Sequence, residues 1–219
     1  FQDGLKVVGD DLFIGLQGSG SSSAGIQIFN TTTDTYTAGR LLAGLPSNNI
    51  NSFLTITETT QSGQVTAETV YIATNNGVAR WNATGDKWET AWTALDGLPI
   101  SFVEDIIEFD GDIWMATPNG ISQYESSNMS ITNYGKTDGL MGTSTWGLVG
   151  ATTSSTDSSG VTTTQNSLFI SHDGRGTDRP GITLFNTGAQ SVSELHQFDQ
   201  LPSNTVTAVT ADLYGIHIA

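Results

Sequence analysis

The chain has 219 residues, which is long enough to bury a sizeable core, and 37% of its residues are hydrophobic while only 13% are charged. Its formal net charge is −15, from 7 basic and 22 acidic residues. Nucleic acid is therefore excluded as a partner, because binding to phosphate depends on clustered cations. The absence of cysteine excludes disulfides, zinc–thiolate sites and cysteine nucleophiles. No apolar stretch approaches the ~18 residues of a membrane span, so no membrane insertion is expected within this segment.

The chain begins at Phe1, without an initiating Met, and ends in a segment that is predicted to be a strand. We therefore expect it to belong to a longer parent chain whose targeting segments lie elsewhere. Acidic surfaces with few lysines repel one another and stay soluble in salt. This favours an exported protein, at an extracellular, periplasmic or cell-surface location.

Three sequence elements recur in the same order with a period of roughly 50 residues. A short apolar run that ends in a small residue occupies 12–15, 70–73, 113–116, 168–171 and 216–219. The motif G-[IV]-x-x-[FWY]-[NE] follows at 25–30, 77–82, 120–125 and 181–186. A turn of the Gly-Leu-Pro type then follows at 44–48, 97–101, 139–143 and 200–204.

Each period contains four predicted strands, which we call A to D. Strand A follows the Gly-Leu-Pro turn, strand B is the apolar run, strand C is the glycine-to-aromatic motif, and strand D is the weaker segment after it. Strand A is expected at 5–8, 49–57, 102–109, 145–152 and 205–212, and strand D at 35–39, 87–93, 129–134 and 191–198. Four short strands per repeat, without helical periodicity, are typical of a β-propeller blade.

The fold class predicted is therefore all-β, a β-propeller with four-stranded antiparallel blades, four of them complete and a fifth cut in half. The blades are expected near 1–47, 48–100, 101–142, 143–203 and 204–219, as one propeller fragment. A β-sandwich would not repeat its turns so faithfully, and a solenoid coil is usually shorter. The A–B connections at 58–68 and 153–166 are rich in Ser, Thr, Gln and Gly, and they are expected to be long loops.

These motifs resemble a known family, the two-component-regulator propeller repeat. The best copies are 70–81 with Gly97-Leu98-Pro99, and 113–124 with Gly139-Leu140. The resemblance implies a place in the extracellular sensor region of a hybrid histidine-kinase receptor, or in another exported protein. The Glu-Asp-x-x-Gly turn that is usual between strands A and B of the family is only echoed, at 108–111.

The strongest candidate for a binding site is the fourth B–C connection. It contains His172, Asp173, Arg175, Asp178 and Arg179 within eight positions. In a propeller the B–C and D–A connections lie on one face, around the mouth of the central channel. Two arginines there are suited to hold a carboxylate, a sulfate or a sugar. The alternatives are a polar loop held together by its own Arg–Asp pairs, and a calcium site that lacks the late bidentate Glu of an EF-hand.

A second group of candidates precedes strand A, where Asn48, Ser101, Thr143 and Asn204 repeat and Trp146 follows. Repetition favours a role in the turn, because Asn and Ser side chains satisfy nearby backbone groups. If the channel mouth binds sugar, Trp146 and Asn48 are candidates to contact it. The other four tryptophans occupy repeat positions and are predicted to pack in the core.

Three N-x-[ST] sequons, at Asn30, Asn82 and Asn128, follow the strand C motif and are candidate glycosylation sites.

The functional prediction is a non-catalytic extracellular module for recognition or ligand sensing, with an extracellular glycan, a small anion or a protein as partner. The alternatives are a structural or adhesive cell-surface repeat protein and a polysaccharide-active propeller enzyme. An enzyme would need paired carboxylates, for which Glu104 and Asp105 with Asp173 or Asp178 are candidates. No motif for a nucleophile elbow, a zinc site or a phosphate loop is present, and no cofactor is expected unless calcium is bound.

Overall fold

A computed structural model of the chain describes residues 4–17, 25–38, 44–174, 181–196, 209–212 and 215–218. Side chains are not described at 37–38, 193–196, 209–212 and 215–218. The chain divides into two compact units, Phe1–Ile106 and Ile107–Ala219, and each is described by itself. The predicted grouping of the whole chain into one propeller fragment stays a prediction.

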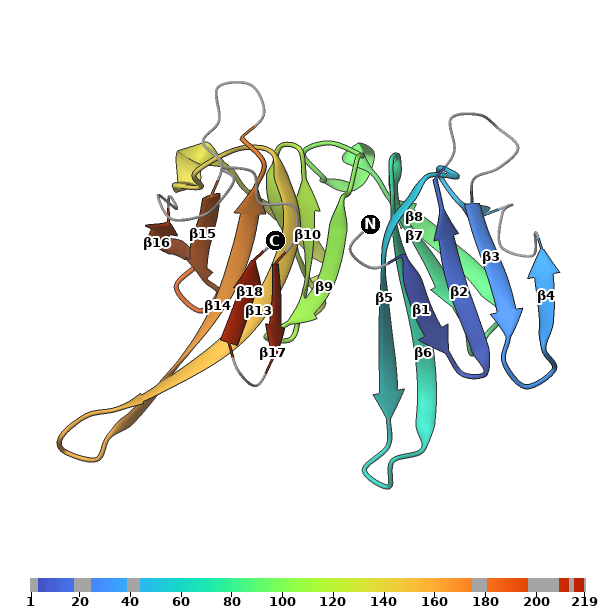
Figure 1. Ribbon diagram of the computed structural model, residues 1–219, viewed down its shortest axis with the longest axis horizontal. Coiled ribbons are helices and arrows are strands. Elements are labelled where there is room, and N and C mark those ends of the chain that lie inside the picture. The colour runs from blue at the N-terminus through green and yellow to red at the C-terminus, as the bar shows by residue number, and fades with distance from the viewer. Residues whose placement is uncertain are drawn as a thin grey trace. The chain divides into compact units, whose positions relative to one another are not determined.

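The first unit contains two four-stranded antiparallel sheets, each with its strands in chain order (Figure 1). The first sheet consists of β1 (Leu5–Val8), β2 (Asp11–Leu16), β3 (Gly25–Asn30) and β4 (Thr35–Ala38). The second consists of β5 (Ile50–Thr59), β6 (Val65–Thr74), β7 (Gly77–Asn82) and β8 (Lys87–Trp92), and the 3₁₀ turn η2 (Ala94–Asp96) follows it.

The second unit repeats this arrangement. The third sheet of the chain lies in this unit apart from Asp105 and Ile106. It consists of β9 (Asp105–Phe109), β10 (Asp112–Thr117), β11 (Gly120–Glu125) and β12 (Ser130–Tyr134), and the 3₁₀ turn η3 (Lys136–Asp138) follows. The fourth sheet consists of β13 (Thr145–Thr156), β14 (Thr162–His172), β15 (Gly181–Asn186) and β16 (Ser191–His196). A fifth, two-stranded sheet pairs β17 (Val209–Asp212) with β18 (Gly215–Ile218).

The prediction of four-stranded antiparallel propeller blades is confirmed, with four complete sheets and a two-stranded fifth. Strand C has its predicted bounds in all four sheets, whereas the third strand A begins at Asp105, three residues later than predicted. Across the residues described, no helix is both long and apolar enough to cross a bilayer.

The A–B connections of the second and fourth sheets are β-ribbons, so the prediction of long loops there was wrong. The ladders continue to Thr59↔Val65 and Thr156↔Thr162. β-Branched Thr suits an extended ribbon, and the hydroxyls of Thr156 and Thr162 pair across it at 2.9 Å. A tight turn ends each ribbon, with Gly63 or Gly160 in a left-handed conformation.

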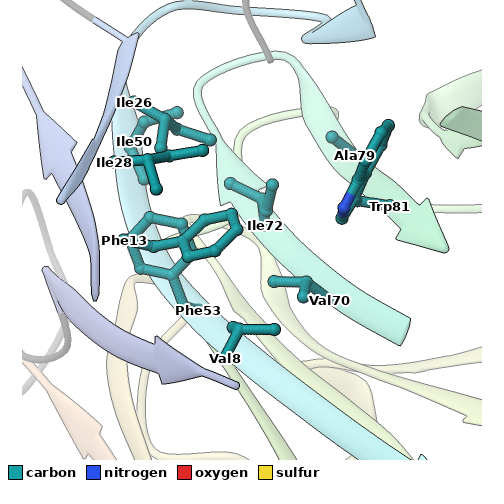
Figure 2. Packing of buried hydrophobic residues seen from close by; sticks show 10 residues of the cluster. All are labelled: Val8, Phe13, Ile26, Ile28, Ile50, Phe53, Val70, Ile72, Ala79 and Trp81. Atoms are coloured by element: carbon teal, nitrogen blue, oxygen red, sulfur yellow. The ribbon is translucent and has the colours of Figure 1, made fainter. Parts of the chain in front are cut away.

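The core of the first unit lies between its two sheets. Figure 2 shows Val8, Phe13 and Ile28 of the first sheet opposite Phe53 and Ile72 of the second. The rings of Phe13 and Phe53 meet edge to face, with their centroids 6.4 Å apart. The second residue of strand B thus faces the following sheet, and the third residue faces the preceding one.

The second unit buries its core in the same way. Trp114, the second residue of its strand B, is fully buried and lies 5.7 Å from the ring of Phe185 in the fourth sheet. The ring of Tyr134 packs against the same Phe185 ring at 4.8 Å. The prediction that the repeat-position tryptophans pack in the core is therefore confirmed for Trp114, and also for Trp81 and Trp92, which are 8% and 6% exposed.

The glycine that starts strand C lies against the backbone of strand D. Gly77 and Gly120 have φ of 118° and 103°. A Cβ at these positions would lie 2.3 Å from the Trp92 carbonyl oxygen and 2.1 Å from that of Tyr134. This close approach explains why the motif starts with Gly.

Candidate functional site

The start of strand A lies at the end of the blade where strand B passes into strand C. In the second and fourth sheets, the A–B ladder contains a β-bulge near the start of strand A. The bulge leaves Asn51 and Trp146 outside the regular register. A bulge redirects a side chain that would otherwise alternate with its neighbours. Asn51 and Trp146 therefore occupy equivalent positions at the same end of their blades.

Asn51 is the centre of a polar network in the first unit, although it is only 6% exposed. Its Oδ1 accepts a hydrogen bond from Gln17 Nε2 at 2.9 Å. Its Nδ2 donates to Asn75 Oδ1 at 3.0 Å and to the Val103 carbonyl at 2.7 Å. The network joins three connections that are distant in sequence, and it satisfies an amide that would be costly to bury unpaired.

Trp146 and Asp173, two of the predicted site residues, are brought together in the second unit. Trp146 Nε1 donates to Asp173 Oδ2 at 2.7 Å. Both side chains are partly exposed. The carboxylate therefore holds the indole at the edge of the blade with part of its surface in solvent.

The two contacts have the same construction. Asn75 directly follows β6 and Asp173 directly follows β14, so each is the first residue of its B–C connection. In both sheets the bulge residue of strand A donates a side-chain hydrogen bond to that residue. The repeat therefore keeps the position of the pair and changes its chemistry, from an amide pair to an indole–carboxylate pair.

His172 is the last residue of β14 rather than part of a loop, so the prediction of its place was wrong. It is fully buried, and its Nε2 lies 2.9 Å from Thr183 Oγ1. The same hydroxyl accepts the Met141 backbone N–H at 3.1 Å. His172 thus supports the strand end and the D–A connection from inside the blade.

The structural role predicted for the Asn and Ser before strand A is seen at Ser101 itself, and at Ser47 in place of Asn48. Ser47 Oγ, not Asn48, accepts the Asn49 backbone N–H at 3.2 Å, and the side chain of Asn48 is exposed. Ser101 Oγ accepts the Ala94 backbone N–H at 3.0 Å, across the D–A connection. Asn204 lies outside the described residues.

Arg175, Asp178 and Arg179 also lie outside the described residues, so their part in a site stays a prediction. Within the ranges that the structure describes, no group of three or more His, Asp or Glu side chains is arranged to hold a metal ion. Calcium binding likewise stays a prediction.

The carboxylates considered for catalysis occupy different environments. Asp105 is 2% exposed, and its Oδ1 accepts hydrogen bonds from Ser52 Oγ and from the Ile106 backbone N–H, both at 2.9 Å. Glu104 is partly exposed. Asp105 therefore has a clear structural role at the start of β9.

The sequons coincide with a turn that the blades need in any case. Asn30 and Asn82 end strand C, and their Oδ1 atoms accept backbone N–H bonds from Thr33 and Gly85. Asn186 forms the same turn without a sequon, with the Ala189 N–H at 2.7 Å. Asn128 lies within the turn of the third sheet, where its amide donates to the Glu125 carboxylate. Turn geometry thus explains why the first two sequons share a place, and glycosylation stays a prediction.

The residues that sequence reasoning missed are Gln17, Asn51 and Asn75. They carry no motif, and Asn next to a turn resembles the many other Asn residues of this chain. Alignment of the repeats on the turn glycines, Gly44 and Gly139, would have placed Asn51 and Trp146 at equivalent positions. Alignment on the last residue of strand B would have done the same for Asn75 and Asp173.

The fold and the repeated strand order define this chain as a β-propeller module. No protein-family model matches the sequence, and no curated protein matches it. A solved extracellular domain from B. thetaiotaomicron, assigned to a one-component system, matches 98% of this chain at 19% identity with a TM-score of 0.63. A second structure of the same domain, there assigned to a hybrid two-component system, also matches 98% of this chain at 19% identity, with a TM-score of 0.62.

In both cases this chain spans only 25% of the solved chain. A dihydro-heme d1 dehydrogenase, NirN, also matches 88% of this chain, at 9% identity and with a TM-score of 0.51. The matched part is 37% of the NirN chain. These likenesses show a shared fold, and the resemblance found in the sequence is confirmed at that level.

Proposed function

We propose that this chain is part of an extracellular or periplasmic sensing propeller, which recognises its ligand on the face of the B–C and D–A connections without catalysing a reaction. The fold is shared by sensor domains and by an enzyme, so the proposal rests on the site rather than on the fold. The solved domain from B. thetaiotaomicron named above is extracellular, which supports the proposed location.

The observation that carries the proposal is the equivalent pair of positions at the ends of the second and fourth blades. One pair is Asn51 with Asn75, and the other is Trp146 with Asp173. A scaffold that changes these side chains while keeping their backbone can present different chemistry from each blade. The partly exposed Trp146 offers a flat apolar surface beside a carboxylate acceptor, an arrangement that suits the face and hydroxyl groups of a sugar.

An extracellular glycan is therefore the first ligand class to test. A small anion, held by Arg175 and Arg179, and a protein surface are the alternatives within the same proposal. An adhesive role would use this face for a cell-surface polymer instead.

The test is a screen of the protein against a glycan array and a panel of small anions, followed by titration of each hit. Trp146→Ala is expected to weaken glycan binding at least about tenfold, which equals the loss of ~1.4 kcal/mol. Trp146→Phe keeps a ring but loses the bond to Asp173, so a smaller loss is expected. Anion binding should instead be lost in the Arg175→Ala, Arg179→Ala double variant.

Val161→Ala is the control, because Val161 is 57% exposed at the tip of the A–B ribbon of the same blade, at the opposite end from the B–C and D–A connections. Equal glycan affinity in Trp146→Ala and the control would contradict the proposed site. Failure of the folded protein to bind any glycan or anion would favour a protein partner or a structural role.

A further inference from the structure

The first sheet packs against the second with one face and presents apolar side chains on the other. We call this other side the outer face. Leu5, Val7 and Tyr36 on it are 60%, 63% and 62% exposed. Its further members are partly buried: Leu12, Ile14 and Phe29. Contiguous exposed apolar residues on a sheet face mark an interaction surface.

The strand registers identify what buries such a face in the second sheet. Leu5 pairs with Ile14 in the first sheet, and Phe53 pairs with Ile72 in the second. Ile14 and Ile72 are both the third residue of strand B, so Leu5 and Phe53 are equivalent positions of strand A. Phe53 is 3% exposed and Ile72 is fully buried, and both lie in the core between the first and second sheets. Leu5 occupies the same position as Phe53 but is twenty times as exposed.

The outer pair of aromatic residues shows the same difference. Phe29 pairs with Tyr36, and their rings lie 4.8 Å apart. The equivalent pair in the second sheet is Trp81 with Trp88, which both pack against the core of the first unit. The equivalent residues of the fourth sheet, which face the third, are also buried: Leu148 3%, Leu168 0%, Ile170 0% and Phe185 0%.

We propose that the outer face of the first sheet is the seat of a further propeller blade, which precedes Phe1 in the parent polypeptide. In both units the covering sheet is the one that comes earlier in the chain: the first covers the second, and the third covers the fourth. The solved extracellular domain from B. thetaiotaomicron is about four times as long as the part that this chain matches, since this chain covers 25% of it. A preceding blade would continue the same order.

The chemistry of that blade follows from the faces that cover the equivalent positions. These faces present an aromatic ring at the second residue of strand B and an isoleucine at the second residue of strand C. In the first sheet these are Phe13 and Ile26, and in the third they are Trp114 and Ile121. The preceding blade is therefore a copy of the same repeat. Its large ring would contact Leu5 as Phe13 contacts Phe53, and Phe29 as Trp114 contacts Phe185.

The test uses the absence of cysteine from this chain. In the parent polypeptide, with any other cysteine replaced, Val7→Cys places a single thiol on the outer face. Val65→Cys is the exposed control, because Val65 is 54% exposed, and Val8→Cys is the buried control at 7%. With folding verified by circular dichroism, the Val7→Cys thiol is expected to react with a maleimide at least about tenfold more slowly than the Val65→Cys thiol. Equal rates for the two would overturn the proposal, and Leu5→Cys provides a second reporter.

The source of the cover is identified by attaching a photoreactive maleimide at Val7→Cys and locating the cross-linked peptide by mass spectrometry. A peptide that precedes Phe1 supports the proposal. A peptide from residues 204–219 would show that the fifth blade covers the face, and a peptide from another copy, distinguished by isotope labelling, would show a dimer. Either result, a lack of cross-linking, or a parent polypeptide that starts at Phe1 would overturn it.

Discussion

At the scale of single residues, the glycine that begins strand C is held by two independent constraints. Gly120 has φ of 103°, which side-chain-bearing residues rarely adopt, and a Cβ there would lie 2.1 Å from a backbone oxygen. Gly111 has φ of 85° but open space around the site of a Cβ. Substitution of each glycine by alanine therefore distinguishes the cost of conformational strain alone, at Gly111, from the cost of strain together with a backbone collision, at Gly120.

Gly120→Ala is expected to lower the free energy of unfolding by about 3 kcal/mol or more, because strand D must move away from strand C. Gly111→Ala should cost only the strain, about 1–2 kcal/mol. Urea denaturation followed by tryptophan fluorescence measures both losses. Equal losses in the two variants would show that the contact with the Tyr134 carbonyl oxygen does not constrain this position.

The pKa of Tyr134 is raised above the value of a free tyrosine. Burial raises the pKa of its hydroxyl, and the negative charges of Glu125, Asp138 and Asp112 raise it further. The hydroxyl donates to Gln123 Oε1 at 2.8 Å, a bond that only the protonated form makes. Because the folded state holds this proton more tightly than the unfolded state, the contribution of Tyr134 to stability is complete below about pH 10 and is lost as the pH rises through the folded-state value.

Above about pH 10, the stability of Tyr134→Phe should therefore depend less steeply on pH than the stability of the unmodified protein. At pH 8 it should also be less stable by about 1 kcal/mol, because Gln123 loses a hydrogen bond in the core. Urea denaturation at pH 8 and at a series of higher pH values tests both effects. Parallel stability curves for the two proteins would contradict the role of Tyr134, since all other tyrosines and lysines are common to both.

At the scale of elements, the fourth blade combines an exposed ribbon with a polar contact to the third. The distal ribbon residues are exposed and bond mainly to one another. At the base of the ribbon, Asn166 Nδ2 donates to Asp110 Oδ1 at 2.6 Å, and Thr187 Oγ1 donates to Asp110 Oδ2 at 2.6 Å. The contribution of the ribbon to stability therefore lies at its base rather than at its tip.

Replacing residues 154–164 by an Asp-Gly turn, the short connection found in the third blade, is expected to change the free energy of unfolding by less than about 1 kcal/mol. Asn166→Ala should cost about 1–2 kcal/mol, because it removes a charge-assisted hydrogen bond between two sheets. Thermal unfolding of both variants makes the comparison. A larger loss from shortening the ribbon than from Asn166→Ala would show that the tip contributes to the fold.

At the scale of the whole molecule, the net charge of −15 acts against the compact state through self-repulsion. Raising sodium chloride from about 10 mM to 150 mM shortens the Debye length from roughly 30 Å to 8 Å and is expected to raise Tm by several degrees. Choline chloride should give the same rise if screening is the cause. An unchanged Tm would show that the acidic residues are spaced too widely to repel, and a rise with sodium alone would indicate a specific cation site.

The sequence by itself determined the blade, because the features that define it are local. A glycine that must approach the next strand, an apolar run for a strand buried on both faces, and a turn before strand A all act within a few residues, so their repetition predicted the strands. Two predictions from the same local chemistry were wrong. Thr and Ser suit both loops and exposed strands, so the ribbons were predicted as loops, and His172 was predicted as the first residue of a loop although it is the last residue of β14.

Only the tertiary structure decided the site and the outer face. The contact between Trp146 and Asp173 depends on a bulge that shifts one register, and the network around Asn51 joins connections separated by more than thirty residues. Leu5 and Phe53 are both apolar residues at the same position of strand A, yet one is exposed and the other buried. Burial and contact depend on which neighbouring sheet supplies the other half of the interface, and that is a property of the packed molecule rather than of any one segment.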